Sequence, residues 1–475
     1  MKKYLSLFIY LSILSGCTNP GGRNWMIPVT IDPSDLDYTA SHMESFEGRR
    51  QQILDSLSNS YVILRSADQG SSNRHEFRPN NYFYHLTGFA ARGSYAVLSG
   101  NSEISYILSA PPQNLRMQIY DGKVMDTDEI LEKYKPDQAY SYRDMRALID
   151  SLARSGAIIY MDKSDRTFLR DLQDRADDEG STQIRHIGDL VDELRVIKEP
   201  LEVEYMQKAC NITAQALTNV MKNCKPGMYE FEMEAVIEGT FLEYGAAMPG
   251  FNSIVGSGPN STTLHYEPNT RLMEEGDLLL MDIGAEYGYY TADISRTIPV
   301  NGKFSARQRE IYELVLEAQK AAIEQMVPGR LHADSHDTVK AVINRGLSEL
   351  GLITDPESDW QVTFYTIHGT SHFLGMDVHD VGDYHERVLE PGMVLTIEPG
   401  IYFRENALEQ AQAMFINDAD SVEIADFVAQ IAPVYEQYLN TGVRTEDDIL
   451  ITTSGNINLS RYAPKEIEDI EQIMR

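Results

Sequence analysis

Two aspartates flank a turn in the stretch Asp277-Leu-Leu-Leu-Met-Asp282-Ile-Gly-Ala-Glu-Tyr-Gly288-Tyr-Tyr-Thr-Ala-Asp293-Ile-Ser-Arg296-Thr297. A two-residue turn at Tyr287-Gly288 would make this stretch a β-hairpin in which Asp282 faces Asp293, with Cβ atoms about 4.5 to 5.5 Å apart. Two carboxylates that close repel each other unless a cation lies between them. The strand around Asp282 is apolar, so we predict a shared metal ion and not two solvated aspartates.

Two glutamates lie in similar surroundings. Glu398 interrupts the apolar run Met393-Val-Leu-Thr-Ile-Glu398-Pro-Gly400-Ile-Tyr402, which predicts a buried strand. A buried carboxylate without a partner is costly, so a cation is expected there; a strand edge that leaves Glu398 in water is the alternative. Glu446 belongs to the acidic cluster Arg444-Thr-Glu446-Asp447-Asp448 before the strand-like run Ile449 to Thr452. Acids at strand ends are ordinarily solvated, so this cluster alone does not define a site.

Histidines supply the remaining chemistry. The segment His368-Gly-Thr-Ser-His372-Phe-Leu-Gly375-Met-Asp-Val-His379 holds three of the chain's 11 histidines. Imidazole is a neutral metal ligand and a proton shuttle near pH 7, and the glycines beside it let backbone and ligand approach closely. His265, on a loop after Gly256-Ser-Gly-Pro-Asn260, is a candidate substrate contact.

Together these residues form a set of four carboxylates and one imidazole. Hard oxygen donors favour Mn²⁺, Co²⁺ or Fe²⁺, whereas structural zinc sites are typically rich in thiolates. Five such ligands suit two ions that share bridging carboxylates. Two ions about 3.5 to 4 Å apart can activate a shared water and polarise a carbonyl, which predicts metal-assisted hydrolysis.

With these motifs the chain resembles the pita-bread metallopeptidases, specifically Xaa-Pro aminopeptidase (aminopeptidase P) and its relative prolidase. The family's hairpin aspartates, the first in Asp-x-Gly and the second before Arg-Thr, match Asp282 and Asp293. The second histidine of His-Gly-x-Ser-His matches His372, the glutamate of Glu-Pro-Gly matches Glu398, and that of Arg-x-Glu-Asp matches Glu446. The resemblance implies two divalent ions on these five residues, Mn²⁺ first, with Co²⁺, Fe²⁺ or Zn²⁺ as alternatives.

The resemblance also implies roles for residues around the ions. The family's substrate-binding and proton-handling histidines and two supporting residues fall on His265, His368, His379, Tyr402 and Arg444. In the mechanism we expect, Glu398 also shuttles a proton, His379 donates a hydrogen bond to the oxyanion, and His265 positions the substrate.

The resemblance leaves the substrate open between two enzymes. We expect an aminopeptidase that releases the N-terminal residue from peptides with proline in the second position, which Ser371 before His372 favours. The alternative is a prolidase restricted to dipeptides, favoured by the long stretch Arg404 to Thr441, which we otherwise interpret as surface decoration. A non-enzymatic pita-bread peptide-binding protein is the third hypothesis, and all five ligands being present argues against it. Creatinase-like relatives lack the full ligand set, and methionine aminopeptidases lack the N-terminal domain.

The domain organisation changes near Lys198-Glu199-Pro200. Before it, short strand-like runs alternate with helical stretches, which predicts a three-layer α/β domain that resembles the creatinase N-terminal domain and spans 26–196. After it, long amphipathic helices at 199–224, 229–244, 305–327 and 333–350 alternate with strands, which predicts an α+β pita-bread catalytic domain over 199–475.

The segment Phe77-Arg78-Pro-Asn80-Asn-Tyr82-Phe-Tyr84-His-Leu86-Thr-Gly88-Phe89 fits the family's N-terminal motif, with one departure. Tyr82 stands where aminopeptidase P often has an aspartate, so a substrate contact made by that side chain across a subunit boundary is in doubt. The family commonly forms dimers or tetramers, and a homo-oligomer is expected here.

The N-terminus predicts an envelope protein. Met1-Lys2-Lys3, a short apolar run and Leu14-Ser15-Gly16-Cys17 resemble a bacterial lipoprotein signal with its lipobox, so residues 1–17 would be a signal peptide and Cys17 would carry lipid. The mature chain would be anchored to a bacterial cell-envelope membrane, periplasmic or outward-facing. Only Cys210 and Cys224 remain, and one helix would hold them about 21 Å apart, so we expect two free thiols.

The chain is strongly acidic, with 72 Asp and Glu against 41 Lys and Arg and a formal net charge of -31. Nucleic acids and anionic lipid surfaces attract positive protein surfaces. We therefore expect no nucleic-acid partner, and contact with a membrane only through the lipid.

Overall fold

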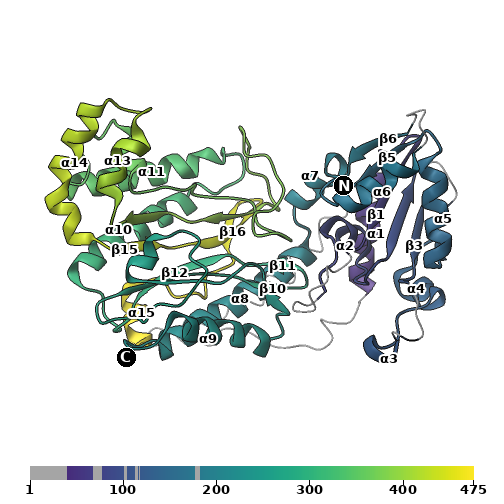
Figure 1. The fold of residues 1–475 in the computed structure, drawn as a ribbon, viewed down its shortest axis with the longest axis horizontal. Coiled ribbons are helices and arrows are strands. Elements are labelled where there is room, and N and C mark those ends of the chain that lie inside the picture. Colours follow the sequence, from purple (N-terminus) through teal and green to yellow (C-terminus); the bar gives the residue numbers. More distant parts are fainter. Residues whose placement is uncertain (1–39, 68–76, 101–103, 113–115, 117, 177–181) are drawn as a thin grey trace.

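The computed structural model describes residues 40–67, 77–100, 104–112, 116, 118–176 and 182–475, so Cys17 and the signal segment lie outside the described residues. These residues form two lobes, with the N-terminal lobe ending at α7 (Gly188–Val196) and the C-terminal lobe beginning at α8 (Pro200–Asn223) (Figure 1). No helix of the described part is both long and apolar enough to cross a membrane.

A six-stranded mixed sheet organises the N-terminal lobe. Its spatial order is β4-β3-β2-β1-β5-β6, antiparallel where β2 meets β1 and β3 and parallel elsewhere. The strands are β1 (Ser60–Arg65), β2 (Tyr95–Ser99), β3 (Tyr106–Ser109), β4 (Gln138–Tyr140), β5 (Ile158–Met161) and β6 (Gln183–His186). On β1, Val62 and Leu64 enter the core of one face and Ile63 that of the other, because side chains alternate along a strand.

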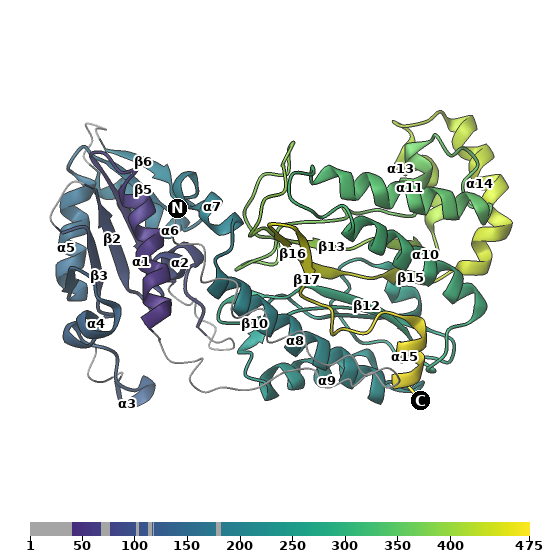
Figure 2. The same cartoon turned by 180° about the vertical axis from the view of Figure 1, so that it is seen from behind.

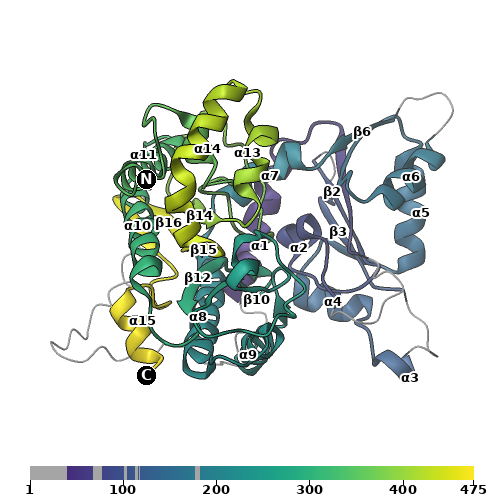
Figure 3. The same ribbon diagram turned by 60° about the vertical axis from the view of Figure 1, so that its left-hand side comes forward.

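Helices cover both faces of this sheet. Figure 3 shows α1 (Ala40–Leu54) and α2 (Asn81–Thr87) on the face toward the C-terminal lobe, and α5 (Tyr142–Ala153) and α6 (Arg166–Arg175) on the outer face. The inner core also takes residues of α4 (Thr127–Tyr134) and α7. A short helix, α3 (Gln118–Asp121), completes this lobe, and the predicted three-layer α/β arrangement is confirmed.

Two pairs of long helices enclose the strands of the C-terminal lobe. In Figure 2, α8 and α9 (Glu230–Glu243) lie below the strands, and α10 (Ala306–Ile323) and α11 (Ala333–Glu349) lie above. All four correspond to predicted helices. Cys210 and Cys224, within α8 and directly after it, are both buried and free, as predicted.

The strands of this lobe form several small sheets, and successive strands often belong to different sheets. One sheet has the order β12-β9-β8 and the next β11-β10-β7; a third has β13-β16-β17, and β14 pairs with β15. The bounds are β7 (Met248–Pro249), β8 (Ile254–Ser257), β9 (Leu278–Ile283), β10 (Ala285–Tyr287), β11 (Tyr290–Thr291), β12 (Ile294–Pro299), β13 (Val394–Ile397), β14 (Gly400–Phe403), β15 (Thr441–Arg444), β16 (Asp447–Thr452) and β17 (Gly455–Asn458). The helices α12 (Asp359–Thr363), α13 (Ala407–Phe415), α14 (Ser421–Tyr435) and α15 (Ile467–Ile473) complete the lobe.

The register predicted for the aspartate hairpin is wrong, because the turn lies one residue later than predicted and each residue therefore pairs two positions further along. The loop is Gly288-Tyr289, both with positive φ (59° and 70°), so Asp282 pairs with Ser295 and not with Asp293. Positive φ at both central residues is the type I′ requirement, and glycine fills the first position here. The register differs by two residues, which leaves both aspartates on the same face of the hairpin.

The apolar run around Glu398 is two strands and not one. β13 pairs with β16 while β14 pairs with β15, so the chain changes sheet at Glu398-Pro399. The region 404–441 forms α13 and α14, and Pro433 lies inside the last turn of α14. A proline in the last turn of a helix removes only one intrahelical donor, so the helix continues around it.

Candidate metal centre

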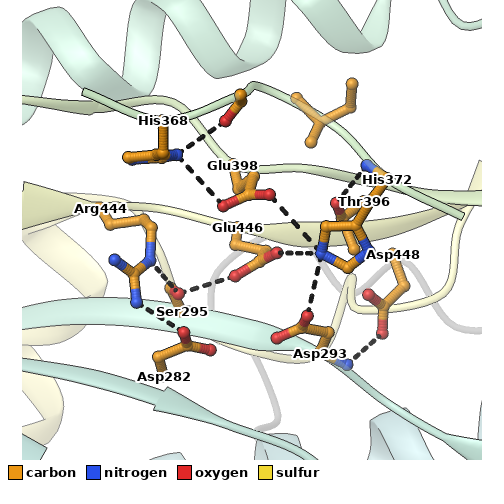
Figure 4. A network of polar contacts seen from close by, with 12 residues as sticks. Asp282, Asp293, Ser295, His368, His372, Thr396, Glu398, Arg444, Glu446 and Asp448 are labelled. Carbon is orange, nitrogen blue, oxygen red and sulfur yellow. Dashed lines mark hydrogen bonds and ion pairs between the residues drawn. The ribbon is translucent and has the colours of Figure 1, made fainter. Parts of the chain in front are cut away.

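Four acidic side chains and one histidine converge between the sheets of the C-terminal lobe (Figure 4). Asp293, Glu398 and Glu446 each lie between two strands, at points where the chain passes from one small sheet to another. Asp282 comes from the end of β9. Sheet changes release the backbone from its ladder, so carboxylates at these points can turn toward one another. The structure therefore brings all five predicted metal ligands together.

His372 lies at the centre of this cluster. Its Nδ1 donates to the Phe373 carbonyl at 3.1 Å, which leaves the Nε2 lone pair facing the acids. Nε2 lies 3.3 Å from Asp293 Oδ2, 3.5 Å from Glu398 Oε1 and 4.0 Å from Glu446 Oε1. A lone pair directed at carboxylate oxygens is repulsive unless a cation lies between them.

Several oxygens of the cluster are buried without a hydrogen-bond partner among the described residues: Asp282 Oδ1, Asp293 Oδ1 and Glu446 Oε1. Burial, reinforced by the neighbouring carboxylates, raises the pKa values of Asp293 and Glu446 far above their usual range. Burial likewise raises the pKa of Glu398 to about 7. Donor atoms of Asp293, His372 and Glu446 all lie within 4.8 Å of one another. The geometry and chemistry of these donors fit divalent cations.

Arg444 supports two of the acids from one side. Its Nη2 contacts Asp282 Oδ2 at 2.5 Å, and its Nε donates to Ser295 Oγ at 2.7 Å. Ser295 Oγ in turn donates to Glu446 Oε2 at 2.7 Å. This chain fixes one oxygen of each acid and leaves Asp282 Oδ1 and Glu446 Oε1 to face the cluster.

His368 is held as a neutral ring. Nδ1 donates to the Gly369 carbonyl at 2.7 Å, so Nε2 accepts a hydrogen bond from the Tyr402 hydroxyl at 2.8 Å. Burial and the nearby Arg444 guanidinium lower the pKa of His368 to about 4. The Arg444 Nη1 also donates to Tyr402 at 3.0 Å, which links both predicted supporting residues to this histidine.

The other two predicted histidines lie at the rim of the cluster. The His379 ring is 4.3 Å from the His372 ring, centroid to centroid, and burial lowers its pKa. His265 is exposed, yet it is near enough to the other two histidines to lower the pKa of both His368 and His379. All the predicted site residues therefore surround one centre.

Three residues that the sequence did not assign to the site complete the surroundings: Ser295, Asp448 and Cys210. Asp448 Oδ2 accepts the Asp293 backbone N–H at 3.1 Å and the Cys210 thiol at 3.1 Å. Ser295 could have been found from the alternation of Asp293, Ser295 and Thr297 on one strand face. Asp448 and Cys210 are joined only by the tertiary fold.

Two models of protein families match the chain. Residues 204–453 match metallopeptidase family M24, and residues 46–160 match the aminopeptidase P N-terminal domain. The chain belongs to metallopeptidase family M24. This membership confirms the predicted pita-bread fold and makes the chain a metal-dependent hydrolase.

Similar M24 proteins span nearly the whole chain. The Xaa-Pro aminopeptidase of Haemophilus influenzae is 36% identical over 447 residues, which are 91% of this chain and 97% of that protein. Xaa-Pro aminopeptidase 3 of Homo sapiens is 32% identical and covers 87% of this chain, with 80% of its own length matched. The structure of aminopeptidase PepP from Pseudomonas aeruginosa superposes with a TM-score of 0.80 at 31% identity, over 91% of this chain and 98% of that one.

In this M24 chain, Tyr82 packs within the N-terminal lobe. Its hydroxyl donates to Asp192 at 2.8 Å, and the Arg195 guanidinium lies 5.1 Å from its ring centroid. Only 7% of Tyr82 is exposed, so the side chain belongs to the lobe's core. A separate cavity of about 1050 Å³ lies between the lobes, with Arg78, Glu286 and Tyr289 in its wall, away from the carboxylate cluster.

Proposed function

We propose that this M24 peptidase is an Xaa-Pro aminopeptidase, which releases the N-terminal residue from peptides with proline in the second position. The observation that carries the proposal is the complete donor set: four carboxylates and His372 Nε2 around one centre, with three buried oxygens that have no hydrogen-bond partner in the described part of the chain. The Xaa-Pro aminopeptidase relatives over nine-tenths of the chain support the substrate class.

The five ligands would hold two divalent ions, Mn²⁺ in first place and Co²⁺, Fe²⁺ or Zn²⁺ as alternatives. The ligands are Asp282, Asp293, His372, Glu398 and Glu446. When bound, the ions supply Lewis acidity, which lowers the pKa of a shared water and polarises the scissile carbonyl. Oxygen-rich donor sets favour Mn²⁺ over the softer ions.

The chain's own residues then handle protons and substrate. Glu398 takes up at its carboxylate the proton that the attacking water loses, and delivers that proton to the leaving imide nitrogen. His379 donates a hydrogen bond to the developing oxyanion, and His265 at the rim positions the peptide. Proline is accepted after the scissile bond because its imide has no N–H to satisfy.

The dipeptidase alternative rests on the insert 404–441. Its helices α13 and α14 lie at the end of the C-terminal lobe away from the N-terminal lobe (Figures 1 and 2). There Phe415 and Phe427 pack around Trp360, with ring centroids 5.4 and 4.8 Å from it. This packing favours decoration of the lobe over a cap on the site, and so favours the aminopeptidase.

The test compares an Xaa-Pro dipeptide with an Xaa-Pro-Yaa tripeptide, using Mn²⁺-loaded protein that lacks residues 1–17. Cleavage of the tripeptide supports the aminopeptidase, and cleavage of the dipeptide alone would make the chain a prolidase. Cleavage of neither would favour the peptide-binding protein. Glu398→Gln serves as the control, because it keeps the side-chain volume and should abolish turnover.

We also propose that Cys17 carries a lipid that anchors the mature chain to the cell envelope, periplasmic or outward-facing, and that the chain forms a homo-oligomer. The lipobox motif before Cys17 supports the anchor. Fractionation tests it: the full chain should sediment with membranes and Cys17→Ser should not. Light scattering on protein without residues 1–17 tests the oligomer, and a monomeric mass would contradict it.

A further inference from the structure

The residue proposed to bind the oxyanion has little support from its own side chain. Among the described residues, His379 makes no hydrogen bond or ion pair through its imidazole, and its one ring contact is with His372. It also lies on an irregular segment outside any strand or helix. The position of its ring therefore depends on the backbone that carries it.

That backbone is held on both sides of His379 by one guanidinium from the N-terminal lobe. Arg195, on the last turn of α7, contacts Asp377 Oδ2 at 3.0 Å and Asp380 Oδ1 at 2.5 Å through the same nitrogen, Nη2. Lys198, between the lobes, reaches Asp380 Oδ2 at 3.3 Å. Arg195 is 2% exposed and Asp380 7%, so water screens this contact little.

The charges in this contact are complementary. Burial alone would raise the pKa of Asp380, but Arg195 and Lys198 outweigh it and lower the pKa, so the carboxylate stays ionised. Burial lowers the pKa of Lys198, which Asp380 opposes. The buried acid therefore has its bases in place and needs no metal.

Gly375 packs closely against the Asp380 side chain. A Cβ added at Gly375 would lie 2.0 Å from Asp380 Oδ2, so only glycine lets the carboxylate reach Arg195 and Lys198. The Asp380 N–H donates to the Phe373 carbonyl at 3.0 Å, next to His372. The loop is thereby closed onto the segment that carries the central ligand.

A second contact from the N-terminal lobe reaches the same loop. Asn81 Nδ2 donates to Asp377 Oδ2 at 2.6 Å, and Arg78 donates to the Met376 carbonyl. Arg78 also pairs with Glu286 at 2.7 Å, on the hairpin that carries Asp282 and Asp293. The N-terminal lobe thus contacts both the loop 375–380, called here the His379 loop, and the hairpin that carries Asp282 and Asp293. It contributes none of the five proposed ligands.

We propose that Arg195 is a positioning residue for the reaction. Its ion pairs with Asp377 and Asp380 fix the backbone on both sides of His379 and so hold the His379 ring beside the metal centre. Through Arg195, the N-terminal lobe would contribute to catalysis. The inference rests on the proposed function, in which His379 binds the oxyanion. Small displacements of a group that acts in the transition state can lower the rate about 100-fold.

The experiment is a double-mutant cycle of Arg195→Gln and His379→Ala in the Mn²⁺-loaded enzyme, with the Xaa-Pro-Yaa tripeptide as substrate. If Arg195 acts through His379, Arg195→Gln should lower kcat about 10- to 100-fold in the wild-type background and less than twofold in the His379→Ala background. KM and the bound Mn²⁺ per chain should change little, because all five ligands lie in the other lobe. Equal losses in both backgrounds would overturn the proposal.

A matched control comes from the same helix. Glu193 on α7 pairs with Arg387 across the lobes at 3.0 and 3.1 Å, and among the described residues it has no hydrogen bond or ion pair with Asp377, His379 or Asp380. Glu193→Gln should leave kcat unchanged. A loss like that of Arg195→Gln would mean that docking of the lobes in general is required, and would contradict a specific role for Arg195.

A second variant keeps the test decisive if Arg195→Gln does not fold, since it leaves Asp380 with one base fewer. Asp377 is half-exposed, so Asp377→Asn removes the ion pair between Arg195 and Asp377 and keeps the buried ion pair between Arg195 and Asp380. It should lower kcat about three- to tenfold, again only when His379 is present. Full activity of Asp377→Asn would overturn the proposal, whereas failure of the wild type to cleave any Xaa-Pro peptide would instead overturn the proposed function.

Discussion

Two neighbouring carboxylates, Glu446 and Asp447, are both fully buried but have opposite surroundings. Asp447 contacts Arg296 at 2.6 Å, Lys465 at 2.5 Å and the Asn458 amide at 2.7 Å. Although burial opposes it, these two bases lower the pKa of Asp447 to about 2. Among the described residues, the Glu446 carboxylate is contacted by the Ser295 hydroxyl and the His372 ring, and burial raises its pKa far above the usual range.

The difference separates two uses of a buried acid. Asp447, like Asp380 at the lobe interface, is neutralised by basic side chains of the protein itself, and its ion pairs connect segments that are distant in sequence. Glu446 and Asp293 have neighbours of their own sign, which is destabilising unless an external cation enters. Glu446 and Asp293, which are buried among other carboxylates, are therefore the acids of this fold that most require a metal ion.

The largest expected effect follows from replacing an acid of the unpaired kind. Glu446→Gln should lower kcat on an Xaa-Pro-Yaa tripeptide on the order of 1000-fold, because the site loses a ligand and a charge. The same change should leave the melting temperature of the metal-free protein equal or higher, because one repelling charge is gone. Turnover assays, metal analysis and calorimetry of the chelated protein measure both. A large loss of metal-free stability would contradict the comparison.

Asp447→Asn should show the opposite pattern. Removing one partner of a buried ion pair leaves Arg296 and Lys465 unbalanced and destabilises the protein by about 3 to 5 kcal/mol. Urea unfolding with and without Mn²⁺ would measure this loss, and the bound metal per folded chain should stay at the wild-type value. If Asp447→Asn instead lost metal while keeping its stability, the distinction between the two acids would fail.

The sequence was sufficient to predict which side chains converge and where the long helices lie, but not the exact geometry. Asp282, Asp293 and Glu398 could be found because an acid in an apolar run needs a cation, and that argument holds whatever the strand pairing. Glu446 and His372 were assigned to the site by their match to the family's motifs. The hairpin register could not be found, because Tyr289 adopts a φ of 70° that glycine would ordinarily take. The sheet changes at Glu398 and Glu446 arise from pairings with strands far along the chain. The Asp448–Cys210 contact likewise joins residues distant in sequence.

Titration of the metal-free protein should show both kinds of acid. The pKa of Asp447 is about 2 when folded and near 3.9 when unfolded, so its contribution is complete above pH 4 and lost as the pH falls toward 2. The pKa of Glu398 is raised to about 7, so its contribution is complete below about pH 4 and lost as the pH rises through 7.

The melting temperature of chelated protein should therefore rise from pH 8 to pH 5 and fall below pH 4. Saturating Mn²⁺ should remove the rise, because the cation favours the ionised carboxylates, while Asp447→Asn should weaken only the fall at acid pH. If the melting temperature of the chelated protein stayed constant between pH 8 and pH 5, the pKa of Glu398 would not be raised in the folded protein, which would contradict the prediction.

The smallest expected effect concerns Asp448, whose surroundings are intermediate between those of Glu446 and Asp447. It has no basic partner among the described residues, yet it accepts the Asp293 N–H and the Cys210 thiol, and burial raises its pKa to about 7. Cys210→Ala removes one weak donor from that carboxylate, so Mn²⁺ affinity should fall less than tenfold and unfolding free energy by about 1 kcal/mol. Cys224→Ala, at the other end of α8, is the control and should leave Mn²⁺ affinity unchanged. A Cys210→Ala protein that bound Mn²⁺ as the wild type does would place Asp448 with the structural acids, because its thiol contact would then have no bearing on the metal centre.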